Sequence, residues 1–66
     1  MIVYSLPDCG RCALIKERLD AKGITYQENQ DVKEMKELGF MTVPMVKTDE
    51  GELLDFGKAI SYINSL

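Results

Sequence analysis

The stretch IVYSLPDCGRC, residues 2–12, places the only two cysteines of the chain, Cys9 and Cys12, between two different secondary-structure patterns. Before them lies a run of the β-branched and aromatic residues that strands favour, and the run is broken at Pro7. After them, residues 13–22 have the periodicity of an amphipathic helix. A Cys-x-x-Cys sequence at a strand-to-helix turn is typical of a dithiol redox centre.

Composition limits the classes to which this chain can belong. Its 66 residues, 45% of them apolar, suffice for a single domain over residues 1–66 with one core. The net charge of −3 and the lack of a basic patch argue against a nucleic-acid partner. No signal-peptide pattern or membrane-length apolar run is visible. We therefore expect a monomeric, cytoplasmic protein without membrane association, and in the cytoplasm a Cys-x-x-Cys pair is typically catalytic or metal-binding.

Periodicity and turn residues divide the chain into four strands and three helices in the order βαβαββα. In the second helix, Asp31 and Glu34 have the spacing of a capping box. Val32, Met35 and Leu38 are expected to face the core from that helix. The expected strands are residues 1–5, 24–28, 42–47 and 52–55, and the expected helices are residues 10–22, 31–39 and 57–64.

This order predicts an α/β fold with a mixed four-stranded sheet flanked by three helices. Strands separated by a helix are expected to pair in parallel through a right-handed crossover. The last two strands, joined by the turn at residues 48–51, must be antiparallel. Ligands of open α/β sheets bind beyond the carboxyl ends of the strands. Because Cys9 follows the carboxyl end of the first strand, we expect it at an exposed edge.

The two cysteines are expected to have different roles. Cys9 stands where the first amide groups of a helix have no intrahelical partner, and these donors together with the helix dipole favour a thiolate. Arg11 adds a nearby positive charge, whereas Asp8 opposes it. Cys12 falls on the apolar face of the helix and should be the more buried thiol. We assign Cys9 as the attacking nucleophile and Cys12 as the resolving thiol.

Other interpretations of the cysteine pair fit less well. A closed zinc site needs four ligands, and the chain has no histidine and no further cysteine. One chain alone therefore cannot form such a site, although a metal shared between two chains stays open. Two ordinary buried cysteines are disfavoured because Cys9 follows Pro7 and Asp8 in an exposed turn.

Three segments together, residues 3–12, 22–26 and 42–44, resemble the glutaredoxins of the thioredoxin-fold superfamily. The third segment, Thr42-Val43-Pro44, is similar to the family's TVP motif. The resemblance implies a thioredoxin fold and a thiol-disulfide oxidoreductase that reduces protein disulfides. It also implies a cis peptide bond before Pro44, although only about 5–6% of X–Pro bonds in folded proteins are cis.

The same resemblance implies which residues bind the substrate. Val43 would pair its backbone groups with an extended substrate or with glutathione, as a short added strand. Arg11, Thr42 and Pro44 are assigned to substrate binding with it. We expect no metal ligand and no bound cofactor.

Two departures from the family bear on the source of electrons. Glutathione-using members typically carry a lysine where this chain has Leu6, and a Gly-Gly-Asp-like turn where it reads LLDFGK at residues 53–58. The missing lysine removes a charge-assisted contact. The short length and the sequence LGFMTVP at residues 38–44 are closer to the NrdH-redoxins, which thioredoxin reductase reduces and which supply ribonucleotide reductase. Of the Ser-Gly-Phe turn of those proteins, only Phe56 is matched.

We therefore expect electrons from thioredoxin reductase and NADPH, or from glutathione, with the first favoured. The expected partners are protein disulfides, with ribonucleotide reductase as a candidate. An alternative function is an iron–sulfur carrier, in which two chains and glutathione bridge a cluster through Cys9. Gly10 fits that alternative, whereas competition from Cys12 opposes it. A redox-responsive binding module is a third, non-catalytic interpretation.

Overall fold

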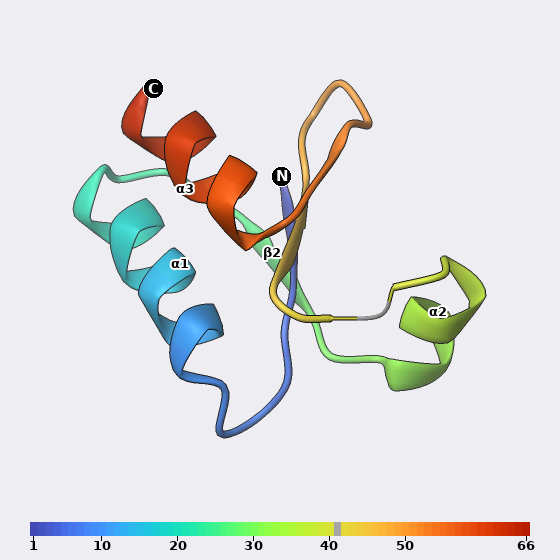
Figure 1. The fold of residues 1–66 in the computed structure, drawn as a ribbon. Helices are drawn as coiled ribbons and strands as arrows, with labels where there is room; N and C mark the ends of the chain where they lie inside the picture. The colour runs from blue at the N-terminus through green and yellow to red at the C-terminus, as the bar shows by residue number, and fades with distance from the viewer. Residues whose placement is uncertain (41) are drawn as a thin grey trace.

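The computed structural model describes residues 1–40 and 42–66. The element order βαβαββα is confirmed (Figure 1). The elements are β1 (Ile2–Tyr4), α1 (Gly10–Ala21), β2 (Gln27–Asn29), α2 (Val32–Glu37), β3 (Met45–Lys47), β4 (Leu53–Leu54) and α3 (Phe56–Asn64). They form the mixed sheet with three helices that is expected of a thioredoxin fold.

The sheet has the strand order β2-β1-β3-β4. β1 pairs in parallel with β2, and β3 pairs antiparallel with β4, as the sequence predicts. The prediction that strands separated by a helix pair in parallel is wrong for β3, which pairs antiparallel with β1. The helix between β2 and β3, α2, has only six residues, or about 9 Å of rise, and does not form a long crossover along the sheet.

The antiparallel pairing of β3 has a direct consequence for the site. Because Met45 is opposite Tyr4, the chain begins β3 at the carboxyl end of β1. Residues 42–44 immediately precede β3, so they lie at the end of the sheet where β1 leads into the cysteines. The bounds predicted for the third strand, residues 42–47, are therefore too wide. Residues 42–44 lie before the strand, and β3 begins at Met45.

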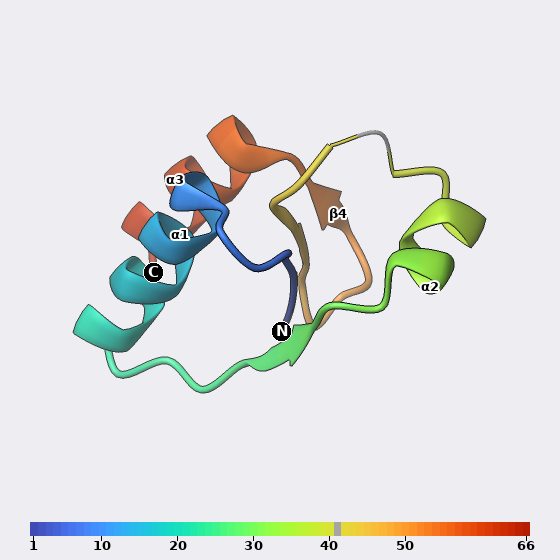
Figure 2. The same ribbon diagram turned by 90° about the horizontal axis from the view of Figure 1, so that it is seen from below.

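The core lies between the sheet and two of the three helices. Figure 2 shows α1 and α3 side by side on one face of the sheet and α2 on the other. The buried cluster on the two-helix side contains Val3, Ile15, Leu19, Val46, Leu54, Ala59 and Ile63. The members of this cluster that come from α1 and α3 follow the spacing of the helical period.

Gly23 ends α1 with a positive φ of 68°, in the left-handed conformation expected just past a helix. The second predicted strand, residues 24–28, begins too early in the sequence. The Ile24 N–H donates to the Leu19 carbonyl at 3.0 Å, so Ile24 belongs to the end of the helix. Ile24 and Tyr26 do pack against the core, but from an irregular segment, and β2 begins only at Gln27.

The first turn of α2 is capped differently from the prediction. Asp31 caps the helix as predicted, accepting from the N–H groups of Lys33 and Glu34. The carboxylate of Glu34 does not return to Asp31. It accepts instead from the side-chain NH2 group of Asn29 at 2.7 Å, and the side-chain oxygen of Asn29, Oδ1, accepts the Asp31 N–H at 2.8 Å. Asn29 thus takes the place of the reciprocal bond in a capping box.

The inward face predicted for α2 is only partly correct. Met35 is buried, but Val32 and Leu38 are each 45% exposed. The helix lies on the face opposite the main core and is too short to bury three positions against the sheet. Val32 instead borders a surface groove described below.

The buried tyrosine of β1 leads to a prediction for alkaline pH. Tyr4 packs edge-on against Phe40 with the ring centroids 4.9 Å apart. Burial, with a smaller contribution from the Glu34 carboxylate, raises the pKa of Tyr4 above its usual value of about 10. The pKa of Tyr26 is also raised, mainly by burial. The unfolded chain therefore loses these protons at a lower pH than the folded chain, which destabilises the fold above about pH 10.

We expect the urea midpoint of the oxidised protein to stay level between pH 7 and 9 and to fall above about pH 10. Tyr4→Phe should show a shallower fall than the unchanged protein because phenylalanine has no proton to lose. Urea titrations followed by circular dichroism at each pH measure both curves. Identical slopes for the two proteins above pH 10 would contradict a role for Tyr4.

Candidate functional site

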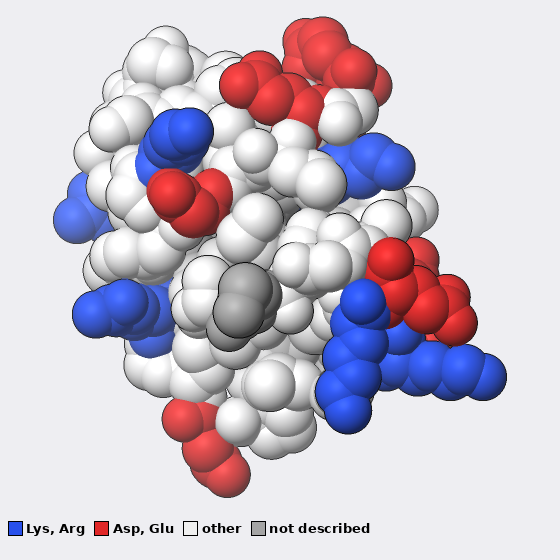
Figure 3. All heavy atoms as spheres, turned by 45° about the vertical axis from the view of Figure 1, so that its right-hand side comes forward, with Lys and Arg blue, Asp and Glu red and all other residues white. Residues whose placement is uncertain are grey.

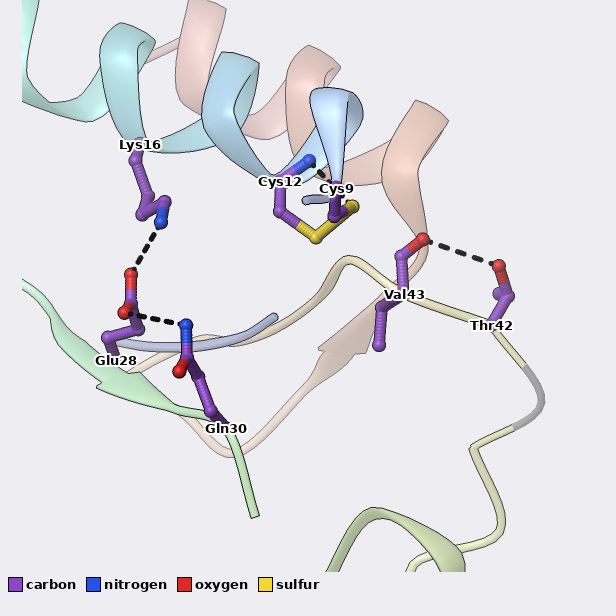
Figure 4. Close-up of a disulfide and its surroundings, with 7 residues drawn as sticks. All are labelled: Cys9, Cys12, Lys16, Glu28, Gln30, Thr42 and Val43. Carbon is purple, nitrogen blue, oxygen red and sulfur yellow. Dashed lines mark hydrogen bonds and ion pairs between the residues drawn. A yellow bond between two sulfur atoms is a disulfide. The ribbon is translucent and has the colours of Figure 1, made fainter. Parts of the chain in front are cut away.

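Cys9 and Cys12 form a disulfide at the start of α1, with their Cα atoms 5.2 Å apart. This separation lies within the usual range of about 4.4–6.8 Å for disulfides. Figure 4 shows the pair at the first turn of the helix, with Val43 on one side of it and Lys16 with Glu28 on the other. The backbone at this strand-to-helix turn therefore accommodates a bridge between the two cysteines.

Cys9 is the N-cap residue of α1. Its sulfur accepts the backbone N–H of Cys12 at 3.1 Å, and its carbonyl accepts the N–H of Ala13 at 3.1 Å. Asp8, just before it, has a positive φ of 63°. Aspartate is one of the few residues besides glycine that tolerate this conformation. The turn thereby directs the Cys9 sulfur at the free amide groups of the helix, which favour a thiolate.

The two sulfurs differ in accessibility, as the sequence predicts. Cys12 is 1% exposed, whereas Cys9 is partly exposed. Cys9 lies in an open surface depression of about 460 Å³. The residues that line it with Cys9 are Leu6, Pro7, Asp8, Gly10, Ala13, Lys16 and Gln30. Only Cys9 is therefore open to a large reaction partner.

Arg11 lies between the two cysteines in sequence and contacts α3. Its guanidinium carbon is 5.4 Å from the centroid of the Phe56 ring, a cation–π arrangement. Arg11 itself is exposed. The sequence singled out Arg11 and Phe56 separately, and the structure shows that they form one contact next to the dithiol.

The TVP motif lies beside the dithiol. The Val43–Pro44 peptide bond is cis, as the resemblance implies. Pro44 is buried, Val43 is half-buried and Thr42 is exposed. The Thr42 hydroxyl donates to the Val43 carbonyl at 3.4 Å (Figure 4). The four residues assigned to substrate binding thus approach the cysteines from two sides, Arg11 from α1 and the TVP motif from the segment before β3.

A groove of about 240 Å³ runs from the TVP motif towards α2. It is mostly apolar, and its lining residues are Leu6, Val32, Met35, Lys36, Phe40, Thr42 and Val43. Pockets for drug-sized ligands are typically about 300–1,000 Å³, so this groove is of a size for one or two side chains. Figure 3 turns the α2 side of the molecule forward and shows a centre without charge, with basic and acidic side chains around it.

Sequence reasoning did not assign Val32 or Phe40 to this surface. The helical period placed Val32 in the core, and Phe40 was noted only within the stretch of residues 38–44. The signal that was available is the length of α2. A six-residue helix cannot bury both of its ends, so an apolar residue at its start is a candidate for a surface contact.

A charged group next to Cys9 was also missed. Lys16 Nζ pairs with the Glu28 carboxylate at 2.8 Å, and Gln30 donates to the same carboxylate at 3.2 Å. The hydrogen bond that Lys16 donates to the Glu28 carboxylate raises the pKa of Lys16. The structure holds Lys16 between α1 and β2, at the border of the depression that contains Cys9.

Neither a metal cluster nor a membrane span is found among the described residues. Within residues 1–40 and 42–66, no group of three or more histidine, cysteine, aspartate or glutamate side chains is placed to hold a metal ion. In the same part of the chain, no helix is long and apolar enough to cross a membrane.

One of three comparisons with known proteins identifies the family of this chain. The glutaredoxin family model matches residues 1–52, which contain both cysteines and the TVP motif. A search of curated proteins and a search of solved structures each give no match. The match covers well over half of the chain, and the cysteine pair within it lies at disulfide distance. This chain is a member of the glutaredoxin family.

Proposed function

We propose that the protein is a dithiol thiol-disulfide oxidoreductase that reduces disulfides in other proteins. The observation that carries this proposal is the asymmetry of the pair. The Cys9 sulfur is accessible and accepts a helix N–H, whereas Cys12 is 1% exposed. A thiolate is the attacking species in exchange, and the position of Cys9 favours it.

The reaction proceeds in two exchange steps. The Cys9 thiolate attacks one sulfur of the substrate disulfide, and the other substrate sulfur leaves as a thiolate that takes up a proton. Cys12 then loses its proton and attacks the Cys9 sulfur of the mixed disulfide. The second substrate sulfur leaves, the Cys9–Cys12 disulfide forms, and two electrons have passed to the substrate.

The substrate polypeptide is proposed to lie along the TVP motif. An extended segment would use the backbone of Val43 as a short added strand. The Thr42 hydroxyl donates to the Val43 carbonyl, and this hydrogen bond helps to hold the Val43 backbone in place. The apolar groove beside Val43 has room for a side chain next to the substrate cysteine.

We infer that thioredoxin reductase with NADPH is a better reductant for this protein than glutathione. The groove wall next to the TVP motif presents the apolar side chain of Leu6 where glutathione-using relatives have a lysine. Lys36 is the one charged residue among those that line the groove. The NrdH-like assignment, with ribonucleotide reductase as a candidate substrate in the cytoplasm, belongs to the same proposal.

A paired reductant assay tests this inference. Insulin reduction is followed through NADPH consumption, once with thioredoxin reductase and once with glutathione and glutathione reductase. We expect the faster turnover with thioredoxin reductase. Robust turnover with glutathione and none with thioredoxin reductase would reverse the assignment.

Leu6→Lys should raise the glutathione-dependent rate by about tenfold, because hydrogen bonds to charged groups contribute roughly 1.5–3 kcal/mol. The matched control is Leu53→Lys, which adds the same charge at an exposed leucine of β4. Leu53 lies opposite Lys47, which itself pairs with Ile2 at the start of β1, so it is far from the dithiol. Equal effects of the two substitutions would show that net charge, not the position of Leu6, sets the glutathione rate.

A further inference from the structure

A buried hydroxyl group lies at the end of β1. Ser5 is 0% exposed, and its side-chain oxygen has no hydrogen-bond partner among the described residues in the disulfide form of the protein. Its backbone, in contrast, is satisfied, because the Ser5 N–H donates to the Asn29 carbonyl at 3.0 Å. Buried hydroxyl groups are almost always paired, and an unpaired one destabilises the state that contains it.

The topology places Ser5 and Cys12 on the facing sides of the sheet and of α1. Side chains alternate along a strand, so Ser5 is on the same face as Val3. Val3 belongs to the buried cluster with Ile15 of α1. The helix runs back over the strand from its carboxyl end, as Figure 1 shows. Ser5 follows Val3 by two residues along the chain. Cys12 precedes Ile15 by about one turn on the same face of α1, and it is also buried.

Reduction changes what Cys12 can offer to a neighbour. In the disulfide its sulfur is bonded to Cys9 and carries no proton. When two electrons and two protons convert the bridge into two thiols, the Cys12 sulfur gains an S–H donor and becomes a better acceptor. Because Cys12 is buried, it must find its partner inside the protein.

We propose that Ser5 is a positioning residue whose hydroxyl oxygen accepts a hydrogen bond from the Cys12 S–H group in the reduced dithiol and loses this partner when the disulfide closes. The inference rests on the proposed function only in requiring that the cysteine pair be reversible. The bond stabilises the reduced form over the oxidised one, which makes the protein a weaker reductant. It also holds the resolving thiol in place until the mixed disulfide forms.

The test is the equilibrium with glutathione, in which the protein dithiol and oxidised glutathione give the protein disulfide and two reduced glutathiones. We expect Ser5→Ala to raise this equilibrium constant about fivefold, because one net hydrogen bond corresponds to roughly a two- to tenfold change. At about 30 mV per tenfold for a two-electron couple, the reduction potential becomes about 20 mV more negative. Ser5→Thr keeps the hydroxyl group and should restore the potential.

Thr48→Val is the matched control. Thr48 is 4% exposed, and its hydroxyl oxygen accepts the Glu52 N–H at 3.1 Å in the hairpin turn, at the other end of the sheet. This substitution removes a buried hydroxyl group and lowers stability, but it should leave the potential unchanged. Equal shifts in Ser5→Ala and Thr48→Val, or no shift in Ser5→Ala, would overturn the role of Ser5.

A second measurement does not depend on the folding of Ser5→Ala. In the Cys9→Ala protein, Cys12 is the only thiol, and its infrared S–H stretching band reports hydrogen bonding directly. We expect the band at lower wavenumber in the folded protein than in urea. A band at the same position in both would overturn the inference. Failure of the unchanged protein to exchange reversibly with glutathione would instead contradict the proposed function, and with it the reversible pair on which this inference rests.

Discussion

Replacing Cys9 with serine is expected to abolish insulin disulfide reduction by this protein. A serine hydroxyl group is not ionised near pH 7 and cannot form a disulfide, so neither exchange step has a route. Cys12 cannot take over the attack, because it is 1% exposed on the inner face of α1. The assay is NADPH-coupled insulin reduction at equal protein concentrations.

The control for this loss of activity is a measurement that shows the Cys9→Ser protein to be folded. Serine is a preferred N-cap residue, so the substitution at the start of α1 should preserve the helix. Circular dichroism of Cys9→Ser should therefore match that of the reduced unchanged protein. Full insulin reduction by a folded Cys9→Ser protein would rule out Cys9 as the nucleophile.

The second large effect concerns stability. Leu19 is 0% exposed and packs in the buried cluster between α1, α3 and the sheet. Truncating a buried leucine to alanine typically costs about 2–5 kcal/mol. At about 0.05–0.15 kcal/mol per residue, a domain of this size has a free energy of unfolding of only about 3–10 kcal/mol. We expect Leu19→Ala to lose a large share of its stability and to populate the unfolded state measurably.

Urea unfolding followed by circular dichroism measures this loss. Leu66→Ala provides a matched control, because Leu66 is 55% exposed at the end of the chain. Exposed substitutions usually change stability by no more than about 0.5 kcal/mol. A Leu19→Ala midpoint equal to that of Leu66→Ala would contradict the packing described for α1.

The sequence predicts α1 and α3 well because both helices bury one regular face. In each, the apolar positions follow the helical period, and the ends are marked by a residue with a physical reason to be there, such as Gly23. The cysteine pair is predictable for a related reason. Its chemistry depends on the strand-to-helix turn, which a local pattern encodes.

What the sequence does not predict depends on contacts between distant segments. A strand is predicted over residues 24–28, but Ile24 and Tyr26 pack against the buried core from an irregular segment. The antiparallel pairing of β3 depends on the short length of α2. The hydrophobic pattern, which includes Leu38, predicts a longer helix than the six residues of α2. The unpaired hydroxyl group of Ser5 is visible only once its surroundings are known.

In the candidate site, too, some residues can be identified from local sequence patterns and others only from the structure. Cys9, Cys12 and the TVP motif follow from their spacing and from the family resemblance. The contact between Arg11 and Phe56 and the pairing of Lys16 with Glu28 join segments far apart in the chain, and no local pattern encodes either.

Trapping of the mixed disulfide tests the different roles of the two cysteines most directly. Cys12→Ser should attack a peptide disulfide through Cys9 and stop there, because no second thiol is present to resolve the adduct. We predict that intact-mass analysis shows one peptide on Cys12→Ser, located at Cys9 by digestion, and no adduct on folded Cys9→Ser. An adduct at Cys12 in Cys9→Ser, with none at Cys9 in Cys12→Ser, would contradict the account.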